Sequence, residues 1–265
     1  IDLQLSVFFV AGFVVLISSL PAGLQSESVR ALGLWGLPVL GLFCLGLAHG
    51  GIDHRLLPQT SKVKFFTLYL AGLFSFFVLW LQCPVCAFAL FVLISGDHFG
   101  ESQFLRALKI SRNQRVIRFL AMAWGLAVSL MAPLFHWETA QPILQSLLRN
   151  SNVGRILTVS EAYFLGLMFC VLSIASAAVI ARYERKAMRR SLPEPLPTVV
   201  LCFILWKLPL IPGFFIFFCF WHSWETILQQ RKGLQWSVKK YVLAATPLTL
   251  VAGLFLILTL TYFES

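Results

Sequence analysis

Long apolar runs separated by short polar segments form the basic pattern of this chain. Each run is near the ~20 residues that an α-helix needs to cross a lipid bilayer. The runs lie at 3–20, 31–50, 64–82, 84–100, 116–135, 156–181, 198–228 and 241–262. The pattern predicts an all-α, polytopic transmembrane helix bundle with about eight spans.

The run 198–228 does not fit a single span. It is too long for one untilted helix and too short for two full ones. The segment "KLPLIPG" at 207–213 places two prolines and a glycine inside it, and such residues kink a helix or turn the chain. We therefore expect two short tilted segments or a re-entrant hairpin, broken at Pro209–Gly213.

The opening run, 3–20, has no basic region before it and no small-residue cleavage site after it. It is interpreted as the first span rather than a signal peptide. Tandem repeats, low-complexity segments and long linkers do not divide the sequence. We expect a single integral-membrane domain over residues 1–265.

Composition supports a membrane protein. Apolar residues make up 58% and charged residues 12% of the chain, against about 45–50% and 25% in soluble domains. The net charge of +10 comes from basic residues in short loops, so it does not indicate a nucleic-acid partner. We expect a multi-pass protein of the cell membrane. Its basic loops 51–63, 101–118 and 182–197 are expected to lie on the cytoplasmic side. Loop 229–240 joins them if the run 198–228 turns back.

Three of the five histidines lie in similar settings, near the ends of apolar runs. His49 is in "AHGGIDH", His98 in "SGDHFGES" and His222 in "FWHSWET". With a hairpin at 207–213, all three reach the same membrane face. Ionisable residues inside spans are expensive and indicate function. Imidazoles that converge from different helices hold transition metals such as iron, copper, zinc or nickel.

Each of these histidines has an acid about one helical turn further along the chain. The pairs are His49 with Asp53, His98 with Glu101, and His222 with Glu225. A carboxylate so placed can accept the second ring N–H of a metal-bound histidine and fix its tautomer. With Asp97, four of the eleven acids of the chain fall in these three motifs. The clustering predicts a shared metal site with the three acids as supporting partners.

The other two histidines are interpreted differently. His54 lies about 140° around a continuous helix from His49, so both bind one ion only if Gly50-Gly51 interrupts the helix. His136, in "FHWET", is interpreted as an interfacial residue beside Trp137.

Three further features stand apart from the histidine motifs. "CPVC" at 83–86 is interpreted as a structural turn rather than a redox or metal site. Glu161 and Lys207 are isolated charges within apolar runs, and each is either paired, snorkelling or functional.

At the three histidine motifs the chain resembles the Brp/Blh family of membrane β-carotene 15,15′-dioxygenases. The resemblance rests on "HGGIDH" at 49–54, "DHFGES" at 97–102 and "PLIPGFFIFFCFWHS" at 209–223, in the order of the family. It spans essentially the whole chain, and the three motifs together are fairly specific.

The resemblance implies a non-haem Fe(II) enzyme that cleaves the central double bond of β-carotene, or of a close carotenoid, with O2 to give retinal. It implies His49, His98 and His222 as iron ligands. Many members carry a second histidine four residues after the last of these, and here that position is Thr226. His54, Asp53, Glu225 or a water are the candidates for a fourth ligand, with His54 first. Retinal would leave through the bilayer or to an opsin.

Two other classes compete with this hypothesis. A non-enzymatic, opsin-like retinal-binding protein would use Lys207 near the seventh span, and a small transporter would show internal repeat symmetry. A histidine-rich di-iron oxygenase needs more than the five histidines present.

Overall fold

The computed structural model describes residues 36–56, 62–111, 113–149, 152, 156–187 and 195–264. All regular elements in these ranges are helices, and none of the described residues forms a strand. The prediction of an all-α protein is confirmed for this part of the chain. The first predicted span, 3–20, lies outside the described residues.

The chain divides into two compact units, which are described separately. Unit 1 combines Ile1–Gly72 with Phe215–Ser265, and unit 2 is Leu73–Phe214. Helix α5 (Lys62–Gln82) crosses the boundary between them. The single integral-membrane domain stays a prediction.

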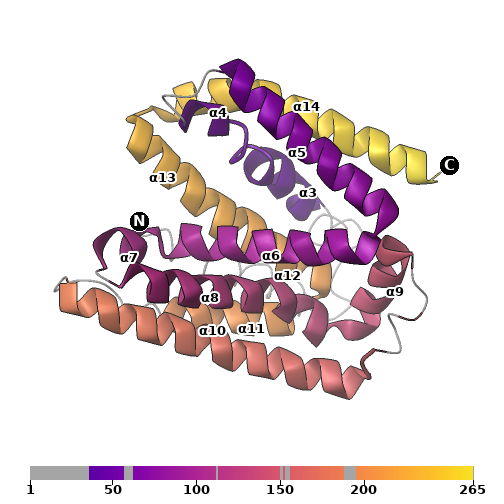
Figure 1. Cartoon of the computed structure of the whole chain (residues 1–265), viewed down its shortest axis with the longest axis vertical. Coiled ribbons are helices and arrows are strands. Elements are labelled where there is room, and N and C mark those ends of the chain that lie inside the picture. The colour runs from indigo at the N-terminus through magenta and orange to yellow at the C-terminus, as the bar shows by residue number, and fades with distance from the viewer. Residues whose placement is uncertain are drawn as a thin grey trace, which may run out of the picture. The chain divides into compact units, whose positions relative to one another are not determined.

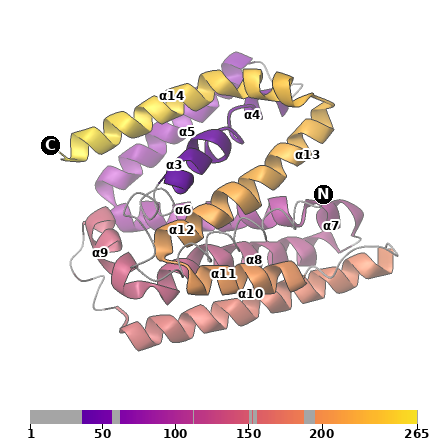
Figure 2. The ribbon, with the colours of Figure 1, turned by 180° about the vertical axis from the view of Figure 1, so that it is seen from behind.

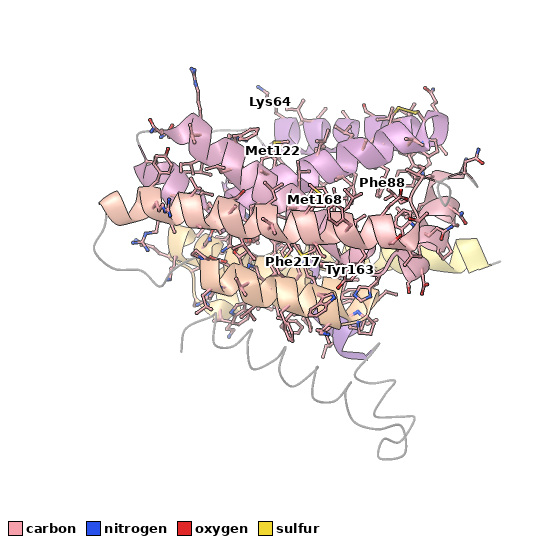
Figure 3. The ribbon with its side chains drawn as sticks, turned by 90° about the horizontal axis from the view of Figure 1, so that it is seen from below. Lys64, Phe88, Met122, Tyr163, Met168 and Phe217 are labelled. Atoms are coloured by element: carbon pink, nitrogen blue, oxygen red, sulfur yellow. A yellow bond between two sulfur atoms is a disulfide. The ribbon has the colours of Figure 1, made fainter. Side chains whose placement is uncertain are left out.

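Unit 2 is a layer of long helices. Its elements are α6 (Pro84–Gln103), α7 (Leu105–Ile110), α8 (Gln114–Phe135), α9 (Trp137–Leu148), α10 (Val159–Ala187), α11 (Pro195–Lys207) and most of α12 (Leu210–Phe215). Helix α8 packs against α6, α10 and α11 (Figures 1 and 2). Its buried Trp124 donates from Nε1 to Thr198 Oγ1 of α11 at 3.2 Å. An apolar cluster of buried residues lies where α8, α9 and α10 meet. Phe88 of α6, labelled in Figure 3, packs against this cluster.

The run 198–228 is broken, as predicted. Helix α11 ends at Lys207 and α12 begins at Leu210, so the break falls at Leu208-Pro209. Proline lacks the amide hydrogen that a continuous helix needs and its ring clashes with the preceding turn. The carbonyl of Pro209 then accepts the amide hydrogen of Gly213 at 2.9 Å, which starts the new helix.

Unit 1 contains two π-helical segments, η3 (Leu42–Gly46) and η5 (Ile216–Ser223). Its other elements are α3 (Leu37–Gly41), α4 (Asp53–Leu56), the first half of α5, α13 (Trp224–Leu234) and α14 (Val238–Glu264). A buried apolar cluster of Ile52, Ile227, Tyr241 and Ala245 joins the turn before α4 to α13 and α14. Short π-helical segments occur frequently at functional sites, so both are candidates for functional elements.

Five helical segments among the described residues are long and apolar enough to cross a membrane. They are Val63–Gln82, Pro84–Gln103, Gln114–Phe135, Val159–Tyr183 and Leu210–Leu234. Four of them match the predicted runs that begin at 64, 84, 116 and 156, and the fifth is the second half of the broken run. Helix α5 exposes apolar side chains along most of its length, a surface suited to lipid rather than water. The predicted count of about eight spans is not confirmed.

Helix α10 begins with a capping box, and this explains Glu161. The Thr158 hydroxyl accepts the amide hydrogen of Glu161 at 3.3 Å, and the Glu161 carboxylate accepts the amide hydrogen of Thr158 at 2.8 Å. The two side chains are also bonded to each other at 2.8 Å. Glu161 therefore satisfies backbone groups at a helix start, which a search for isolated intramembrane charges does not reveal.

The "CPVC" segment starts α6. Pro84 occupies the first turn of the helix, and Cys83 and Cys86 form a disulfide around that turn. Proline favours this position because its fixed backbone angle suits a helix start. The structural interpretation of this turn agrees with the fold, although the spacing alone did not establish the bond.

Candidate metal centre

His49 lies in a turn that interrupts the second apolar run. The π-helix η3 ends at Gly46, the chain turns through residues 47–52, and α4 starts at Asp53. The glycine pair Gly50-Gly51 is therefore inside a break, not inside a helix. At Gly51 an added Cβ would lie 2.9 Å from the Ala245 carbonyl oxygen of α14. Only glycine lets the turn come this close to the α14 backbone.

A backbone carbonyl three residues earlier in the chain orients the ring of His49. Its Nδ1 lies 2.5 Å from the carbonyl oxygen of Gly46. A carbonyl oxygen only accepts, so Nδ1 carries the hydrogen and a neutral ring has its lone pair on Nε2. Metal-binding histidines use this arrangement, with one nitrogen donating to a fixed acceptor and the other facing the metal.

His222 lies within η5 and is 3% exposed. The hydroxyl of Ser223 donates to the Phe218 carbonyl at 2.7 Å, five residues back, and so satisfies an acceptor in the widened turn. Thr226 donates from Oγ1 to the His222 carbonyl at 2.9 Å. At the position where relatives were expected to carry a second histidine, this chain therefore has a hydroxyl that bonds the backbone of His222.

The structure brings His49 and His222 together inside unit 1. Their ring centroids are 5.2 Å apart with the ring planes at 85°. The Phe218 ring lies against both, 5.6 Å from His49 and 6.1 Å from His222. Two imidazoles are thus held side by side in an aromatic setting.

Glycines at the ends of α3 and η3 allow this meeting. At Gly46 a Cβ would lie 2.9 Å from Phe218 Cε1, and at Gly41 it would lie 3.4 Å from Cys219 Cβ. The two π-helical segments can therefore pack closely, and larger residues at Gly46 would push Phe218 and the histidine rings apart. These glycines are not among the predicted site residues, although the small residues at 41 and 46, ahead of His49, were the available signal.

His98 belongs to unit 2, where it lies exposed on α6 between two buried glycines. At Gly100 a Cβ would overlap the carbonyl oxygen of Ala121, and at Gly96 it would lie 2.5 Å from Leu126 Cδ2. At Gly125 of α8, a Cβ would overlap the Gly96 carbonyl oxygen in return. The glycines form a G-x-x-x-G motif, which lets the backbones of membrane helices approach closely. This motif places one face of α6 against α8, and His98 lies outside that helix–helix contact.

His98 borders an open hollow of about 490 Å³ on unit 2. The apolar part of its lining comes from α6 and α8, and Met122 of α8 is labelled in Figure 3. The lining residues are Leu93, Ile94, Asp97, His98, Glu101 and Met122. An extended apolar ligand would meet aliphatic side chains on one side of the imidazole and carboxylates on the other.

The acids beside His98 face a basic residue of α8. Arg118 forms a salt bridge with Asp97 at 2.9 Å and approaches Glu101 at 4.0 Å. In unit 1, Glu225 accepts a hydrogen bond from Gln229 at 3.3 Å. The predicted roles of Glu101 and Glu225 as partners of the histidines stay predictions. The side chains of Asp53 and His54 lie outside the described part of the structure, although their backbones form the start of α4.

His136 and Lys207 have structural surroundings. His136 lies at the junction of α8 and α9, and its Nε2 is 3.1 Å from the Leu205 carbonyl oxygen. The exposed Lys207 ends α11 with its Nζ 3.6 Å from the ring centre of Trp206. A cation–π contact at a helix C-terminus accounts for this lysine without a bound retinal.

These features define a class of protein. It is a helical protein with several helices apolar enough to span a bilayer, and its unit 1 holds the imidazoles of His49 and His222 next to each other, as in a metal site. Their imidazole nitrogens suit iron, copper, zinc or nickel.

Comparison with known proteins gives the family. The family model described as beta-carotene 15,15'-dioxygenase matches residues 40–265, so the chain belongs to this family. It is 24% identical over 187 residues to the beta-carotene 15,15'-dioxygenase of uncultured marine bacterium 66A03. The match covers 68% of this chain and 63% of that relative's length. No solved structure matches the chain.

Proposed function

We propose that this protein is an Fe(II)-dependent dioxygenase that splits the central double bond of β-carotene, or a close carotenoid, with O2. The two halves leave as retinal, each taking one oxygen atom. The observation that carries the proposal is the His49–His222 pair, with rings 5.2 Å apart and the His49 tautomer set by Gly46. Membership of the beta-carotene 15,15'-dioxygenase family supports the substrate and reaction.

In this proposal His98 joins His49 and His222 as the third ligand of one iron site. Three imidazoles leave coordination positions open, and iron(II) bound there would supply the redox chemistry that O2 needs to react with a carbon–carbon double bond. His54 is the first candidate for a fourth ligand. The break at Gly50-Gly51 supports this choice, and so does the Thr226 hydroxyl, which is bonded to the His222 carbonyl. The carboxylates of Asp53, Glu101 and Glu225 would accept hydrogen bonds around the site.

The residues around the histidines would bind and orient the substrate. The aliphatic side chains of Leu93, Ile94 and Met122 beside His98 suit a long polyene. The ring of Phe218 lies against His49 and His222 and would keep water from reactive oxygen species. Holding the polyene in one register limits the reaction to one double bond.

The membrane is the natural source of this substrate. A carotenoid dissolves in the hydrocarbon core, so an enzyme made of spanning helices can take it up from the side. We propose a multi-pass protein of the cell membrane with about eight spans and its basic loops in the cytoplasm. Retinal then leaves into the bilayer, or to an opsin where the cell has one.

Expression in a β-carotene-accumulating bacterium tests the proposal. We expect the colour to bleach and retinal to appear by chromatography. His49→Ala, His98→Ala and His222→Ala should each abolish product, while His136→Ala, which replaces a histidine bonded to Leu205, should retain activity. Unchanged carotenoid, with the protein present in the membrane and iron supplied, would refute the function. Full turnover by His98→Ala would refute the three-histidine site.

A further inference from the structure

A chain of hydrogen bonds in unit 1 ties the His49 turn, residues 47–52, to the last two helices. Gln230 of α13 donates from Nε2 to the carbonyl oxygen of His49 at 3.1 Å. Tyr241 of α14 donates from its hydroxyl to Gln230 Oε1 at 2.6 Å. The same hydroxyl lies 3.5 Å from the Ala48 carbonyl. Side chains from two consecutive helices therefore hold the His49 carbonyl of the turn, and the Tyr241 hydroxyl lies beside the carbonyl before it.

The apolar surroundings of these hydrogen bonds strengthen their effect on the His49 turn. Tyr241 is 3% exposed and packs in the apolar cluster with Ile52, at the end of the turn. The hydroxyl of the buried Tyr241 is costly to leave unsatisfied, so its bond to Oε1 favours one orientation of the half-buried Gln230 amide. With its oxygen occupied by Tyr241, its NH2 group is directed at the His49 carbonyl. Tyr241 thus fixes Gln230, and Gln230 fixes the backbone of His49.

Gln230 also relates His49 to His222. It lies eight residues after His222 along η5 and α13, about 12 Å at the ordinary helical rise. One helical segment therefore carries a predicted ligand in η5 and, about two turns later in α13, the side chain that bonds the backbone of the other predicted ligand. Movement of α13 would shift both histidines together.

We propose that Gln230 and Tyr241 are positioning residues that hold the His49 imidazole in register with His222 for metal binding. This inference rests on the proposed function, because it assigns the His49–His222 pair to a metal site. Neither residue is a predicted metal ligand. Their effect passes through the His49 backbone, because the bond from the His49 ring Nδ1–H to the Gly46 carbonyl needs the turn to keep its shape.

Two variants separate the bonds from the packing. Tyr241→Phe removes one hydroxyl and keeps the buried ring, whereas Gln230→Met keeps a side chain of similar length without a donor or acceptor. Tyr69→Phe is the matched control, because Tyr69 of α5 is 55% exposed and stacks on Phe65. If Tyr241→Phe fails to fold, Gln230→Met decides the question.

The first readout is hydrogen exchange in the metal-free, full-length protein in detergent. Loss of one bond from the network should speed exchange of the amides in residues 47–52 by about 3- to 10-fold. Amides elsewhere in α13 and α14 should keep their wild-type rates. A general loss of protection across both helices would instead show a purely structural role and overturn the inference.

The second readout is the affinity for Co(II), used as a spectroscopic substitute for iron(II). Each variant should bind Co(II) about 3- to 10-fold more weakly than wild type, because it lacks one hydrogen bond of the network that fixes the His49 turn. Tyr69→Phe should match wild type. Wild-type affinity in both Tyr241→Phe and Gln230→Met would overturn the inference and leave the proposed function intact. If wild type itself binds no Co(II) or iron(II), the metal site of the proposed function fails, and the positioning role fails with it.

Discussion

Replacing Gly100 with alanine tests whether the close contact of α6 and α8 positions His98. An added Cβ would overlap the carbonyl oxygen of Ala121 and lie 3.0 Å from the amide nitrogen of Met122. Both atoms belong to the backbone of α8, so no side-chain rotation relieves the overlap. The helices must separate at this level, and His98, two residues away on α6, must move with them.

The size of the effect follows from two opposing contributions. In an open helix, glycine to alanine stabilises by about 0.5–1 kcal/mol because glycine loses more backbone entropy on folding. Overpacking a close contact costs about 1–3 kcal/mol, and a rigid backbone neighbour favours the upper end. Met122 N alone must move by about 0.4 Å, from 3.0 Å to the ordinary 3.4 Å contact. We expect a net destabilisation of about 2 kcal/mol, or a Tm about 4–8 °C lower.

Gly72→Ala provides the matched control for this substitution. It makes the same change in the exposed helix α5, where an added Cβ meets nothing within 4 Å. Its Tm should stay equal to wild type or rise slightly. Thermal unfolding in detergent, Co(II) affinity and carotenoid bleaching are measured for both variants. We expect Gly100→Ala to lose stability and at least about tenfold in Co(II) affinity, as for a displaced ligand. If Gly100→Ala matches Gly72→Ala in all three assays, the glycine contact does not position His98.

Three further substitutions test residues for which the structure shows a structural contact. Thr158→Ala should lower stability by about 1 kcal/mol, seen as a Tm lower by about 2–4 °C, because it removes a helix cap. Glu161→Gln should keep both Tm and activity, since glutamine also serves a capping box; an inactive Glu161→Gln would restore a functional role for the charge. Lys207→Gln should leave carotenoid cleavage unchanged, since the lysine side chain lies over Trp206. A visible absorption band on adding retinal to wild type, absent in Lys207→Gln, would instead support an opsin-like protein.

Much of the architecture was predictable from local pattern. The apolar runs at 64–82, 84–100, 116–135 and 156–181 correspond closely to α5, α6, α8 and α10. The proline break near 209 was also predictable, because proline acts on its own backbone and the preceding turn. Such features depend on residues within one or two turns, so a single sequence contains the required information.

The interpretation of isolated charges was less secure. Glu161 was left open between pairing and function, and the capping box with Thr158 decides it. The signal was present as "TVSE", a threonine with a glutamate three residues on. The predicted apolar run begins at 156, two residues before Thr158, whereas the helix itself begins at Val159. Element boundaries are the part of a local pattern that tertiary context shifts most easily.

The sequence by itself determined the class of fold, the apolar spans and the three histidine motifs, because hydrophobic length and residue chemistry are local properties. Only the tertiary structure decided how the histidines are held. The π-helical form of η3 and η5, the Nδ1–H bond of His49 and the Gly96–Gly100 face all depend on where other backbones pass. The bond from Gln230 to His49 joins residues 181 positions apart. No local pattern specifies such a pair, since the packing of whole helices brings it together.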